Sequence, residues 1–534
     1  MLRTTAAFLF VACTWMIVST AAFAQPASFM ISEAASDIID MDKPRVAVGA
    51  DGSSAVAFDA LVDGEFVDGW HVGVQRFSPT GAAVGPIHLF EPESGCTSFD
   101  FWTSDYQHDA EIAFRSDGIL MVVMQHAGSL EVAGDGWITA ELTIGAIGVD
   151  GQAIDLNPEL SNCEQHKLIF VGGSRQDRAR LALLPDNSML ITADGFFQSS
   201  DLRNVAIRAL GPELEEIIEE VIPHDDPASQ QSFHMRPDIS TNGNLMLSVW
   251  QECPIVDQQG NADDCDIGAQ FGSVTPEGLV AVGTNQQVNA GDQAGTLQLY
   301  PSSAMNAAGA SVIVWADART GLNGDIFAQR FDAQGQAVGA NIQVSVGEGV
   351  IDTRPEVAML DDGSFMVVWT DSTAGAYRAR GREFDAGGNA LSQPFLLSNQ
   401  AGVHTGVPHV ASSGTEFVYV WGTQQDGSFG IYSNDLGSVV ANEPDVAPAA
   451  LKLDVYPNPF TAESTVRYRL PHPDLVTVSV FDVLGREVAR LADGRQLAGV
   501  HDVRLSRPDL PAGAYLIRLR AGNQHHTSLL IKTE

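Results

Sequence analysis

The stretch Arg354–Leu397 reads RPEVAMLDDGSFMVVWTDSTAGAYRARGREFDAGGNALSQPFLL and contains one complete unit of a pattern that recurs along the chain. It holds an apolar run ending at Trp369, a polar loop, a second strand ending at Phe384-Asp385, a Gly turn and a last apolar strand. The run before Trp369 is apolar on both faces, which is typical of a strand buried on both sides. The unit predicts four short strands, here termed A to D, separated by turn residues.

Seven copies of this unit can be aligned on the apolar run of strand B. The equivalent positions are Phe58, Met124, Ala193, Trp250, Trp315, Trp369 and Trp421. Their spacings of 52 to 69 residues suit four-stranded propeller blades with long loops. A linear array of β-sandwich modules is the alternative, but independent sandwiches usually need roughly 100 residues each. The repeat therefore favours a propeller.

The two ends of the repeat region complement each other. The seventh copy stops after its third strand, FGIYSNDLGS, whereas Ser28–Glu33 (SFMISE) is a lone strand with no partners before it. We expect this strand to complete the last blade. The predicted fold is all-β: a seven-bladed β-propeller closed by an N-terminal strand, followed by a small C-terminal β-sandwich.

Four segments are expected along the chain. Residues 1–24 have the features of a cleaved signal peptide, with Arg3, an apolar run over Ala6–Ala22 and small residues at Ala22 and Ala24. A membrane anchor is the alternative, but the run is short for a spanning helix, and no later stretch approaches a membrane span. The propeller is expected over 25–441, a linker rich in Pro and Ala over 442–450, and a compact β domain over 451–534.

Charge divides the chain in the same place. The formal net charge is −38, from 29 Lys+Arg and 67 Asp+Glu. From Asp445 onward there are 11 basic and 10 acidic residues; with Arg3 set aside, residues 25–444 hold 17 basic and 57 acidic. Nucleic acid is therefore excluded as an expected partner, because affinity for phosphates comes from Lys and Arg. Only four Lys among so many acidic residues suggests a salty habitat.

Cysteine usage indicates an oxidising compartment. Cys13 lies in the signal segment, and the four remaining cysteines are an even number in an exported chain. The expected register places Cys96 and Cys163 in the loops before and after the second copy, and Cys253 and Cys265 within one loop between strands B and C. It predicts two disulfides, Cys96–Cys163 and Cys253–Cys265. Buried free thiols are the alternative.

The last 85 residues carry four motifs in a fixed order. These are YPNPF (Tyr456–Phe460), VFDVLGREV (Val480–Val488), LPAGAYLIRL (Leu510–Leu519) and the closing LLIK. With them, the region resembles the C-terminal sorting domain of the type IX secretion system. The resemblance implies a Bacteroidota-type source, the type IX machinery as a partner and delivery to the cell surface or medium. The motif residues are Tyr456, Pro457, Asn458, Pro459, Gly485, Gly513 and Tyr515.

The repeats carry a looser resemblance. The phrase DIFAQRFDAQGQAVGANIQVS after VIVWAD is similar to a repeat of large bacterial extracellular and adhesin-like proteins. Copies one, five and six match this phrase well, whereas copies two, three and seven depart from it. The resemblance implies surface location more than any activity.

Motifs of catalysis are missing from the sequence. It contains no nucleophile elbow, HExxH, P-loop, dinucleotide fingerprint or sialidase Asp-box, so no catalytic or cofactor-binding residue is assigned. Acidic loops at Val256–Asp266 and Asp317–Asp325 offer the oxygen ligands that calcium prefers, although a solvated loop in an acidic protein is the simpler interpretation. The candidate calcium ligands are Asp257, Asn261, Asp263, Asp264 and Asp266.

Histidines recur in the expected loops on one face of the ring. His could act there as a metal ligand or general base, but loops radiating from a ring do not converge, so surface histidines without partners are the simpler expectation. The histidines concerned are His108, His126, His166, His224, His234 and His404, and the aromatic residues of the same loops, Phe99, Phe101, Trp102 and Tyr106, could stack on sugar rings.

Three functions follow from this pattern. The favoured one is a secreted or surface-attached, non-enzymatic propeller for binding or adhesion, with its glycan or protein ligand on the loop face or at the mouth of the central channel. The second is an exported polysaccharide hydrolase or lyase, which rests on fold analogy. The third is a structural surface protein that needs no ligand.

Overall fold

The computed structural model describes residues 29–30, 38–62, 70–90, 105–130, 137–156, 167–170, 177–195, 204–221, 232–254, 265–275, 278–289, 296–320, 324–346, 351–373, 376–397, 407–425, 428–434, 452–456, 458–461, 463–470, 474–482, 486–496, 499–507, 510–521 and 524–533. These residues form strands and turns, with no helix among them. The chain divides between Asn442 and Glu443 into two compact units. Each unit is described by itself.

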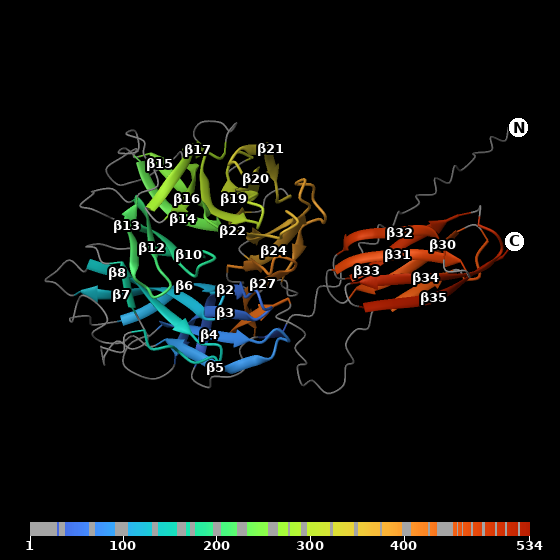
Figure 1. The fold of residues 1–534 in the computed structure, drawn as a ribbon, viewed down its shortest axis with the longest axis horizontal. Coiled ribbons are helices and arrows are strands. Elements are labelled where there is room, and N and C mark those ends of the chain that lie inside the picture. The colour runs from blue at the N-terminus through green and yellow to red at the C-terminus, as the bar shows by residue number, and fades with distance from the viewer. Residues whose placement is uncertain are drawn as a thin grey trace, which may run out of the picture. The chain divides into compact units, whose positions relative to one another are not determined.

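Seven four-stranded antiparallel sheets make up the described part of the first unit (Figure 1). In six of them, four consecutive strands pair in chain order. The first three sheets contain β2 (Ile38–Val48), β3 (Ser54–Val62), β4 (Trp70–Phe77) and β5 (Ala83–Phe90); β6 (Asp105–Phe114), β7 (Leu120–Leu130), β8 (Trp137–Ile147) and β9 (Lys167–Phe170); and β10 (Asp177–Leu183), β11 (Met189–Gly195), β12 (Asn204–Leu210) and β13 (Glu216–Val221).

The next three sheets repeat this order. They contain β14 (Ser232–Asn242), β15 (Leu245–Pro254), β16 (Asp266–Thr275) and β17 (Gly278–Gln287); β18 (Gln298–Met305), β19 (Ser311–Asp317), β20 (Asp325–Phe331) and β21 (Ala337–Gln343); and β22 (Ile351–Met359), β23 (Phe365–Thr373), β24 (Ala376–Phe384) and β25 (Phe395–Leu396). Short turns join the strands. Gly363, for example, has a φ of 85° in the turn between β22 and β23, a conformation that favours glycine.

The seventh sheet combines both ends of the unit. It contains β26 (His409–Ser412), β27 (Phe417–Gln425) and β28 (Ser428–Ser433), and its fourth strand is β1 (Phe29–Met30). The backbone of Phe29 is opposite Ser433, and that of Met30 is opposite Tyr432. An N-terminal strand therefore adds to the last three strands of the unit.

The core of this unit lies between neighbouring sheets. Each of seven apolar clusters joins two sheets that follow each other in the chain, except one that joins the seventh sheet to the first. In that cluster Val56 and Phe58 of β3 pack with Val420 and Ile431. Two-sided burial explains the near-continuous apolar runs of the second strands, because these strands have no solvated face.

The position that repeats on the second strands belongs to one of these clusters in six of the seven sheets. Trp369 packs with Val312, Val314 and Ala328 of the preceding sheet, and its indole Nε1 donates to Asp352 Oδ1 at 3.0 Å. All seven equivalent side chains are at most 2% exposed; they are Phe58, Met124, Ala193, Trp250, Trp315, Trp369 and Trp421. The prediction that Trp369 packs between sheets is confirmed.

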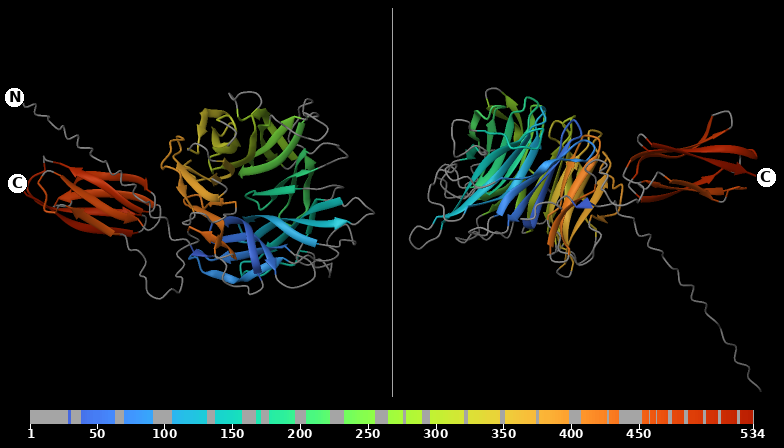
Figure 2. Two further views of the ribbon diagram at one scale, coloured as in Figure 1. Left: turned by 180° about the vertical axis from the view of Figure 1, so that it is seen from behind. Right: turned by 90° about the horizontal axis from the view of Figure 1, so that it is seen from below.

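The first strands surround a common axis in a β-propeller-like arrangement (Figure 2). Contacts connect β2 to β6, β6 to β10, β10 to β14, β14 to β18, β18 to β22, β22 to β26 and β26 to β2. The same seven strands are therefore the ones whose side chains approach the axis.

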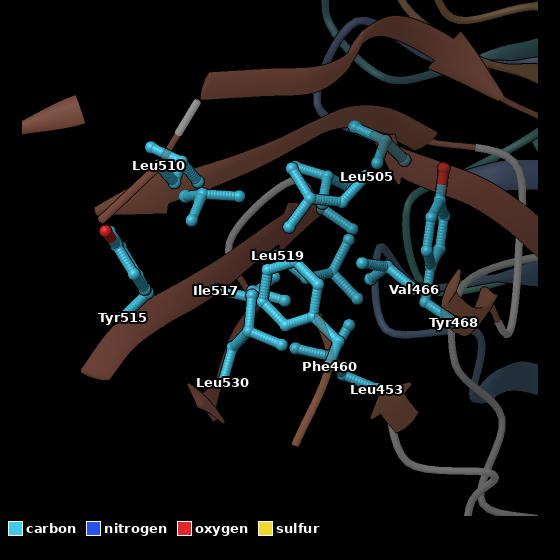
Figure 3. Close-up of a cluster of buried hydrophobic side chains, with 14 residues drawn as sticks. Leu453, Phe460, Val466, Tyr468, Leu505, Leu510, Tyr515, Ile517, Leu519 and Leu530 are labelled. Atoms are coloured by element: carbon cyan, nitrogen blue, oxygen red, sulfur yellow. The ribbon is translucent and has the colours of Figure 1, made fainter. Parts of the chain in front are cut away.

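The C-terminal unit consists of two sheets. One contains β29 (Lys452–Tyr456), β30 (Glu463–Leu470) and β33 (Gly499–Ser506); the other contains β32 (Glu487–Gln496), β31 (Asp474–Asp482), β34 (Gly513–Ala521) and β35 (Gln524–Lys532). Side chains of both sheets form one buried cluster that includes Phe460, Val466 and Ile517 (Figure 3). A two-sheet β domain at this end agrees with the alternating strands of its sequence.

Candidate functional site

A kink recurs in the first strand of six sheets. The pairing of β2 with β3 shifts between Asp42 and Arg45, and that of β22 with β23 shifts between Thr353 and Glu356. Equivalent shifts occur in β6, β10, β14 and β18. Such β-bulges leave residues unpaired and redirect side chains, and they are common next to functional sites.

The bulged residues have an unusual backbone. The first residue of the bulge has a positive φ in five strands, with values of 48° to 59° for Lys43, Asp109, Arg236, Tyr300 and Arg354. Non-glycine residues adopt this region at a cost, and such strain concentrates at functional sites. Two carboxylates hold the conformation: Asp59 Oδ1 accepts from the Asp109 amide at 3.0 Å, and Asp194 Oδ2 accepts from the Arg236 amide at 2.8 Å.

A pocket of about 280 Å³ lies where these bulges meet. Six of the first strands contribute to it, and Val407 contributes from the segment before β26. Because every sheet supplies at least one lining residue, the pocket lies on the axis; we term it the axial pocket. Its lining residues are Lys43, Arg45, Asp109, Ala179, Arg180, Arg236, Pro237, Tyr300, Pro301, Arg354, Pro355, Glu356 and Val407.

A network of charged side chains, here termed the axial network, joins the first strands across the axis, and Arg45, Arg180 and Glu356 of this network also line the pocket. Arg180 contacts carboxylates of three other sheets, with 3.3 Å from Nη1 to Glu111 Oε2, 3.4 Å from Nε to Asp238 Oδ1 and 3.1 Å from Nη2 to Glu356 Oε1. Arg45 lies 3.4 Å from Glu111 and 3.6 Å from Glu356. The side chains occupy the third position of the bulge in each strand, so the backbone repeat places them together.

Burial and charge act differently on the three carboxylates. Burial raises the pKa of Asp238 to about 7, although Arg180 opposes this shift. Burial also raises the pKa of Glu111 against the influence of Arg180 and Arg45. For Glu356 burial is outweighed by Arg180 and Arg45, and its pKa is lowered. Glu356 is therefore ionised at neutral pH, whereas Asp238 is partly protonated.

His409 completes this layer as a neutral side chain. Burial, reinforced by Arg45, lowers its pKa to about 3. Its Nδ1 accepts a hydrogen bond from the Val46 amide at 3.2 Å, which connects β26 to β2. A ring nitrogen that accepts from an amide must be unprotonated, so hydrogen bonding and burial both favour the neutral form.

At the outer layer, basic side chains gather around one aromatic ring. Arg236 Cζ lies 3.9 Å from the centroid of the Tyr300 ring, and Arg354 Cζ lies 5.8 Å from it. Both distances are within the range of cation–π attraction. Lys43 Nζ pairs with Asp109 Oδ1 at 2.8 Å and with Asp59 Oδ2 at 3.3 Å. The arrangement can hold an anion at the mouth of the axial pocket.

The residues expected from the sequence to carry chemistry lie elsewhere. Of the calcium candidates only Asp266 is described, since residues 255–264 fall outside the described part; its Oδ1 accepts from the side-chain amides of Gln287 and Asn289, each at 2.8 Å. Within the described ranges, no group of three or more His, Cys, Asp or Glu side chains could hold a metal ion. Calcium binding stays a prediction.

One of the two expected disulfides is present in the structure. Cys253, at the end of β15, is bonded to Cys265, just before β16. Gln251 Nε2 donates to the Cys253 sulfur at 3.1 Å. The disulfide spans the segment between the second and third strands of the fourth sheet. Cys96 and Cys163 lie outside the described residues, so the other pairing stays a prediction.

The histidine interpretation needs a correction. His234 was expected on the surface without a partner, but it lies within β14, is 0% exposed, and its Nδ1 is 3.2 Å from Asn204 Oδ1. Six of the first strands begin earlier in the chain than the sequence predicted, because each of the six continues on the far side of a bulge. His108 and His126 also lie in strands, β6 and β7. His166, His224 and His404, with Phe99, Phe101 and Trp102, lie outside the described residues, whereas Tyr106 is in β6.

The sequence does contain a signal for the axial pocket. Equivalent tripeptides recur in all seven copies. Six occupy the bulge, and the seventh leads into β26; they are Lys43-Pro44-Arg45, Asp109-Ala110-Glu111, Arg178-Ala179-Arg180, Arg236-Pro237-Asp238, Tyr300-Pro301-Ser302, Arg354-Pro355-Glu356 and Val407-Pro408-His409. Pro or Ala stands at the centre each time. Alignment on strand B left this repeat unnoticed, because its charged residues looked like solvated loop positions.

The sorting motif forms the junction between β35 and the segment before β30. Asn458 Nδ2 donates to the Leu529 carbonyl at 2.7 Å, and its Oδ1 accepts from the Ile531 amide at 2.9 Å. The Asn458–Pro459 peptide is cis. Tyr515 is buried and donates to the Pro511 carbonyl at 2.7 Å. The first and last motifs are thus paired in space, although 71 residues separate Asn458 from Leu529.

The remaining motif residues have different positions. Tyr456 is 44% exposed, with Arg467 Cζ 5.3 Å from its ring centroid. Gly513 starts β34 and is exposed. Pro457 and Gly485 are among the residues that the structure does not describe.

Comparison with known families identifies the C-terminal unit. Residues 454–533 match the secretion system C-terminal sorting domain. The chain therefore ends in a type IX sorting domain, which the secretion machinery recognises, and the protein is exported to the cell surface or the medium. Among the described residues, no helix is long and apolar enough to cross a membrane.

The body has similarities of fold at low sequence identity. No curated protein matches the chain. A protein of unknown function from Dyadobacter fermentans DSM 18053 is similar with a TM-score of 0.44 and 12% identity, over 77% of this chain and 97% of that one. Polysaccharide lyase Uly1 has 0.45 and 10%, over 77% and 98%. The α-L-arabinanase of Penicillium chrysogenum has 0.39 and 12%, over 78% and 100%.

Proposed function

We propose that the protein is a secreted or surface-attached binding protein without catalytic activity. Its body, residues 25–441, is a closed seven-bladed β-propeller that holds a ligand in the axial pocket. Residues 1–24 are a cleaved signal peptide, residues 442–450 a linker and residues 451–534 the sorting domain. A propeller suits a binding function, because it presents variable loops and channel residues on a stable frame.

Three observations support closure of the ring. The N-terminal strand β1 pairs with β28 of the last sheet. An apolar cluster joins the seventh sheet to the first. The Val46 amide donates to His409 Nδ1 across the same interface. Closure would hide the edges of the first and last sheets, which are otherwise sites of unwanted pairing.

The axial pocket itself carries the proposal of binding. Five non-glycine residues around it adopt positive φ, and backbone strain of this kind persists only where the surroundings over-determine it. Each of these residues comes from a different sheet. The fold thus holds side chains from five sheets in fixed positions around one cavity, as a binding site requires.

The carboxylates of the pocket favour binding over hydrolysis. Glycoside hydrolysis needs one carboxylic acid with a raised pKa and a second carboxylate on the other side of the substrate. Of the two carboxylates that line the pocket, Asp109 is ion-paired with Lys43, and Glu356 has a lowered pKa through Arg180 and Arg45. Neither is arranged as a proton donor.

The test combines a glycan and protein binding array with a polysaccharide degradation screen, using residues 25–534. We expect saturable binding without turnover, lost in Val407→Trp, because an indole at position 407 would fill part of the pocket. Val149→Trp is the matched control, since Val149 is 63% exposed and lies outside the pocket. If the protein degrades a polysaccharide and Val407→Trp abolishes this activity, the protein is an enzyme and the proposal of binding without catalysis is wrong. Absence of any ligand would favour the structural role.

A further inference from the structure

We propose that the axial pocket binds a single anionic oxygen group, a carboxylate or sulfate, on a ligand about the size of one sugar residue. The inference rests on the proposed binding function and specifies the chemistry of its ligand. It assigns Arg354 and Arg236 as the groups that hold the anion, with Tyr300 as the residue that positions them.

The charge of the pocket is opposite to that of the chain. Residues 25–444 hold 17 basic residues against 57 acidic. Five of those basic residues line the one pocket, together with two acidic ones. The rest of this region is strongly acidic. The fold therefore gathers basic side chains from several sheets around this pocket.

The two acidic residues that line the pocket are already ion-paired. Lys43 pairs with Asp109, and Arg45 and Arg180 contact Glu356. Arg354, in contrast, is exposed and forms no ion pair with any residue that the structure describes; its guanidinium lies 5.8 Å from the centroid of the Tyr300 ring. A guanidinium with five donors at the mouth of a pocket is suited to a carboxylate or sulfate that approaches from solvent.

Tyr300 and the bulges prepare the two guanidinium groups for such an anion. Cation–π contact holds a guanidinium over the ring face while its N–H donors remain at the rim. The residue after each of Arg236, Tyr300 and Arg354 is proline, which restricts the backbone of the bulge. Two Arg side chains attached to restricted backbone lose little freedom when they bind, and planar Arg forks match carboxylate and sulfate oxygens.

The size of the pocket and the field of the body limit the ligand. A volume of about 280 Å³ is near the lower end of ligand pockets, which span about 300–1,000 Å³. A long polyanion would also meet the repulsion of the acidic body. The pocket therefore favours one charged unit, which is either a free monosaccharide or the end of a chain. The salt dependence of binding distinguishes these two ligands, because salt screens the long-range repulsion that acts on a charged chain.

The experiment is calorimetry on residues 25–534 with four probes: galacturonic acid, galactose 6-sulfate, neutral galactose and trigalacturonic acid. We expect the two charged monosaccharides to bind and galactose to bind at least about 10-fold more weakly, since a hydrogen bond to a charged group contributes about 1.5–3 kcal/mol. Trigalacturonic acid should gain affinity relative to the monomer between about 0.01 M and about 0.1 M NaCl, as the Debye length falls from about 30 Å to about 10 Å.

Three variants and one control locate the anion. Arg354→Gln should weaken the charged monosaccharides about 10- to 100-fold, and Tyr300→Leu should weaken them less. Arg115→Gln is the matched control: Arg115 loses the same charge, pairs with Asp117 and lines a different pocket at the turns that follow the first strands. Val407→Trp should abolish binding of both charged sugars. Melting temperatures of all variants confirm folding.

The outcomes separate this inference from the proposed function. If galactose binds as tightly as galacturonic acid, and Arg354→Gln leaves both unchanged while Val407→Trp abolishes both, the pocket is a site for neutral ligands and only the anion inference is wrong. If neither charged sugar binds, the anion inference is also wrong, and the array ligand still tests the function. Charged sugars that bind Val407→Trp normally would overturn the location of the site for both.

Discussion

At the scale of single residues, the repeated tripeptide of the first strands does two things. In six copies its first residue lines the axial pocket, and in five its third residue belongs to the ion pairs of the axial network. The two positions differ in their demands. The outer residue tolerates different side chains because it is partly solvated, whereas the inner residue must have a partner because burial of an unpaired charge is costly.

Arg180 is the residue on which the axial network depends most. Arg180→Met would leave Glu111, Asp238 and Glu356 buried and facing one another, so we expect a loss of about 3–5 kcal/mol in the free energy of unfolding. Chemical denaturation measures this loss. Arg520→Met, at an exposed position of β34, is the control and should change stability by less than about 0.5 kcal/mol. A loss below about 1 kcal/mol for Arg180→Met would contradict the importance of the network.

Asp238 should make stability depend on pH. Its pKa is about 7 in the folded state against an ordinary value of 3.8, so the folded protein keeps this proton over a range of pH where the unfolded chain has lost it. Its stabilising contribution is therefore complete below about pH 4 and is lost as the pH rises through about 7, by at most about 1.4 kcal/mol per pH unit. The groups that face it are Arg180, Glu356, Glu111 and Ser303.

Denaturation of Asp238→Asn between about pH 4 and about pH 8 tests this dependence. The amide has the shape of the protonated acid, so the difference in stability between the variant and the parent should grow as the pH rises. A difference that stays constant would show that Asp238 is ionised throughout this range. Asp352, whose pKa burial raises to about 6, is unchanged in the comparison and does not enter it.

At the scale of elements, the N-terminal strand has the largest expected effect for its length. Deletion of Ser28–Glu33 removes β1, whose described pairing covers only two residues. If this strand closes the ring, its loss opens the interface between the last and first sheets, and the melting temperature should fall by much more than removal of an exposed strand would cause. Thermal unfolding measures the fall. An unchanged melting temperature would contradict closure.

Two of the second strands have small residues opposite their large rings within the same sheet. Trp250 is opposite Gly268 of the next strand, and Phe58 is opposite Gly73. A Cβ on Gly268 would lie 2.5 Å from the Trp250 indole nitrogen. At these two positions the large ring thus requires a glycine on the neighbouring strand, whereas Trp315 is opposite Phe327. This pairing was not evident from the sequence, because the glycine and the aromatic residue lie on different strands.

At the scale of the whole molecule, the negative charge of the body should make stability depend on salt. Self-repulsion among 57 acidic and 17 basic residues weakens the folded state, and salt screens it. We expect the melting temperature to rise between about 0.05 M and about 1 M NaCl, where the Debye length falls to about 3 Å. A flat or falling curve would contradict adaptation to a salty habitat. Residues from Asp445 onward have nearly balanced charge, so the sorting domain should respond little.

Much of this architecture follows from sequence patterns with a short range. Apolar runs at a regular spacing predict the second strands, glycine turns delimit the units, and motifs at the C-terminus predict the sorting domain. These features depend on neighbouring residues and on burial, which periodicity reports directly. The sequence predicted a ligand site on the loop face or at the mouth of the central channel, but not the residues that form it. The residues of the pocket were missed because no local sequence pattern shows that a charged residue in a bulge is buried.

By itself the sequence determined the order of the strands, the change of charge at the C-terminal domain and the route of export, because each of these depends on residues that are contiguous in the chain. Only the tertiary structure decided which charges meet. Arg180 contacts Glu356 across 176 positions of the chain, and Val46 contacts His409 across 363. The reason is geometric: the first strands of all seven sheets approach one axis, so residues that are unrelated in the sequence share one cavity and one electrostatic environment.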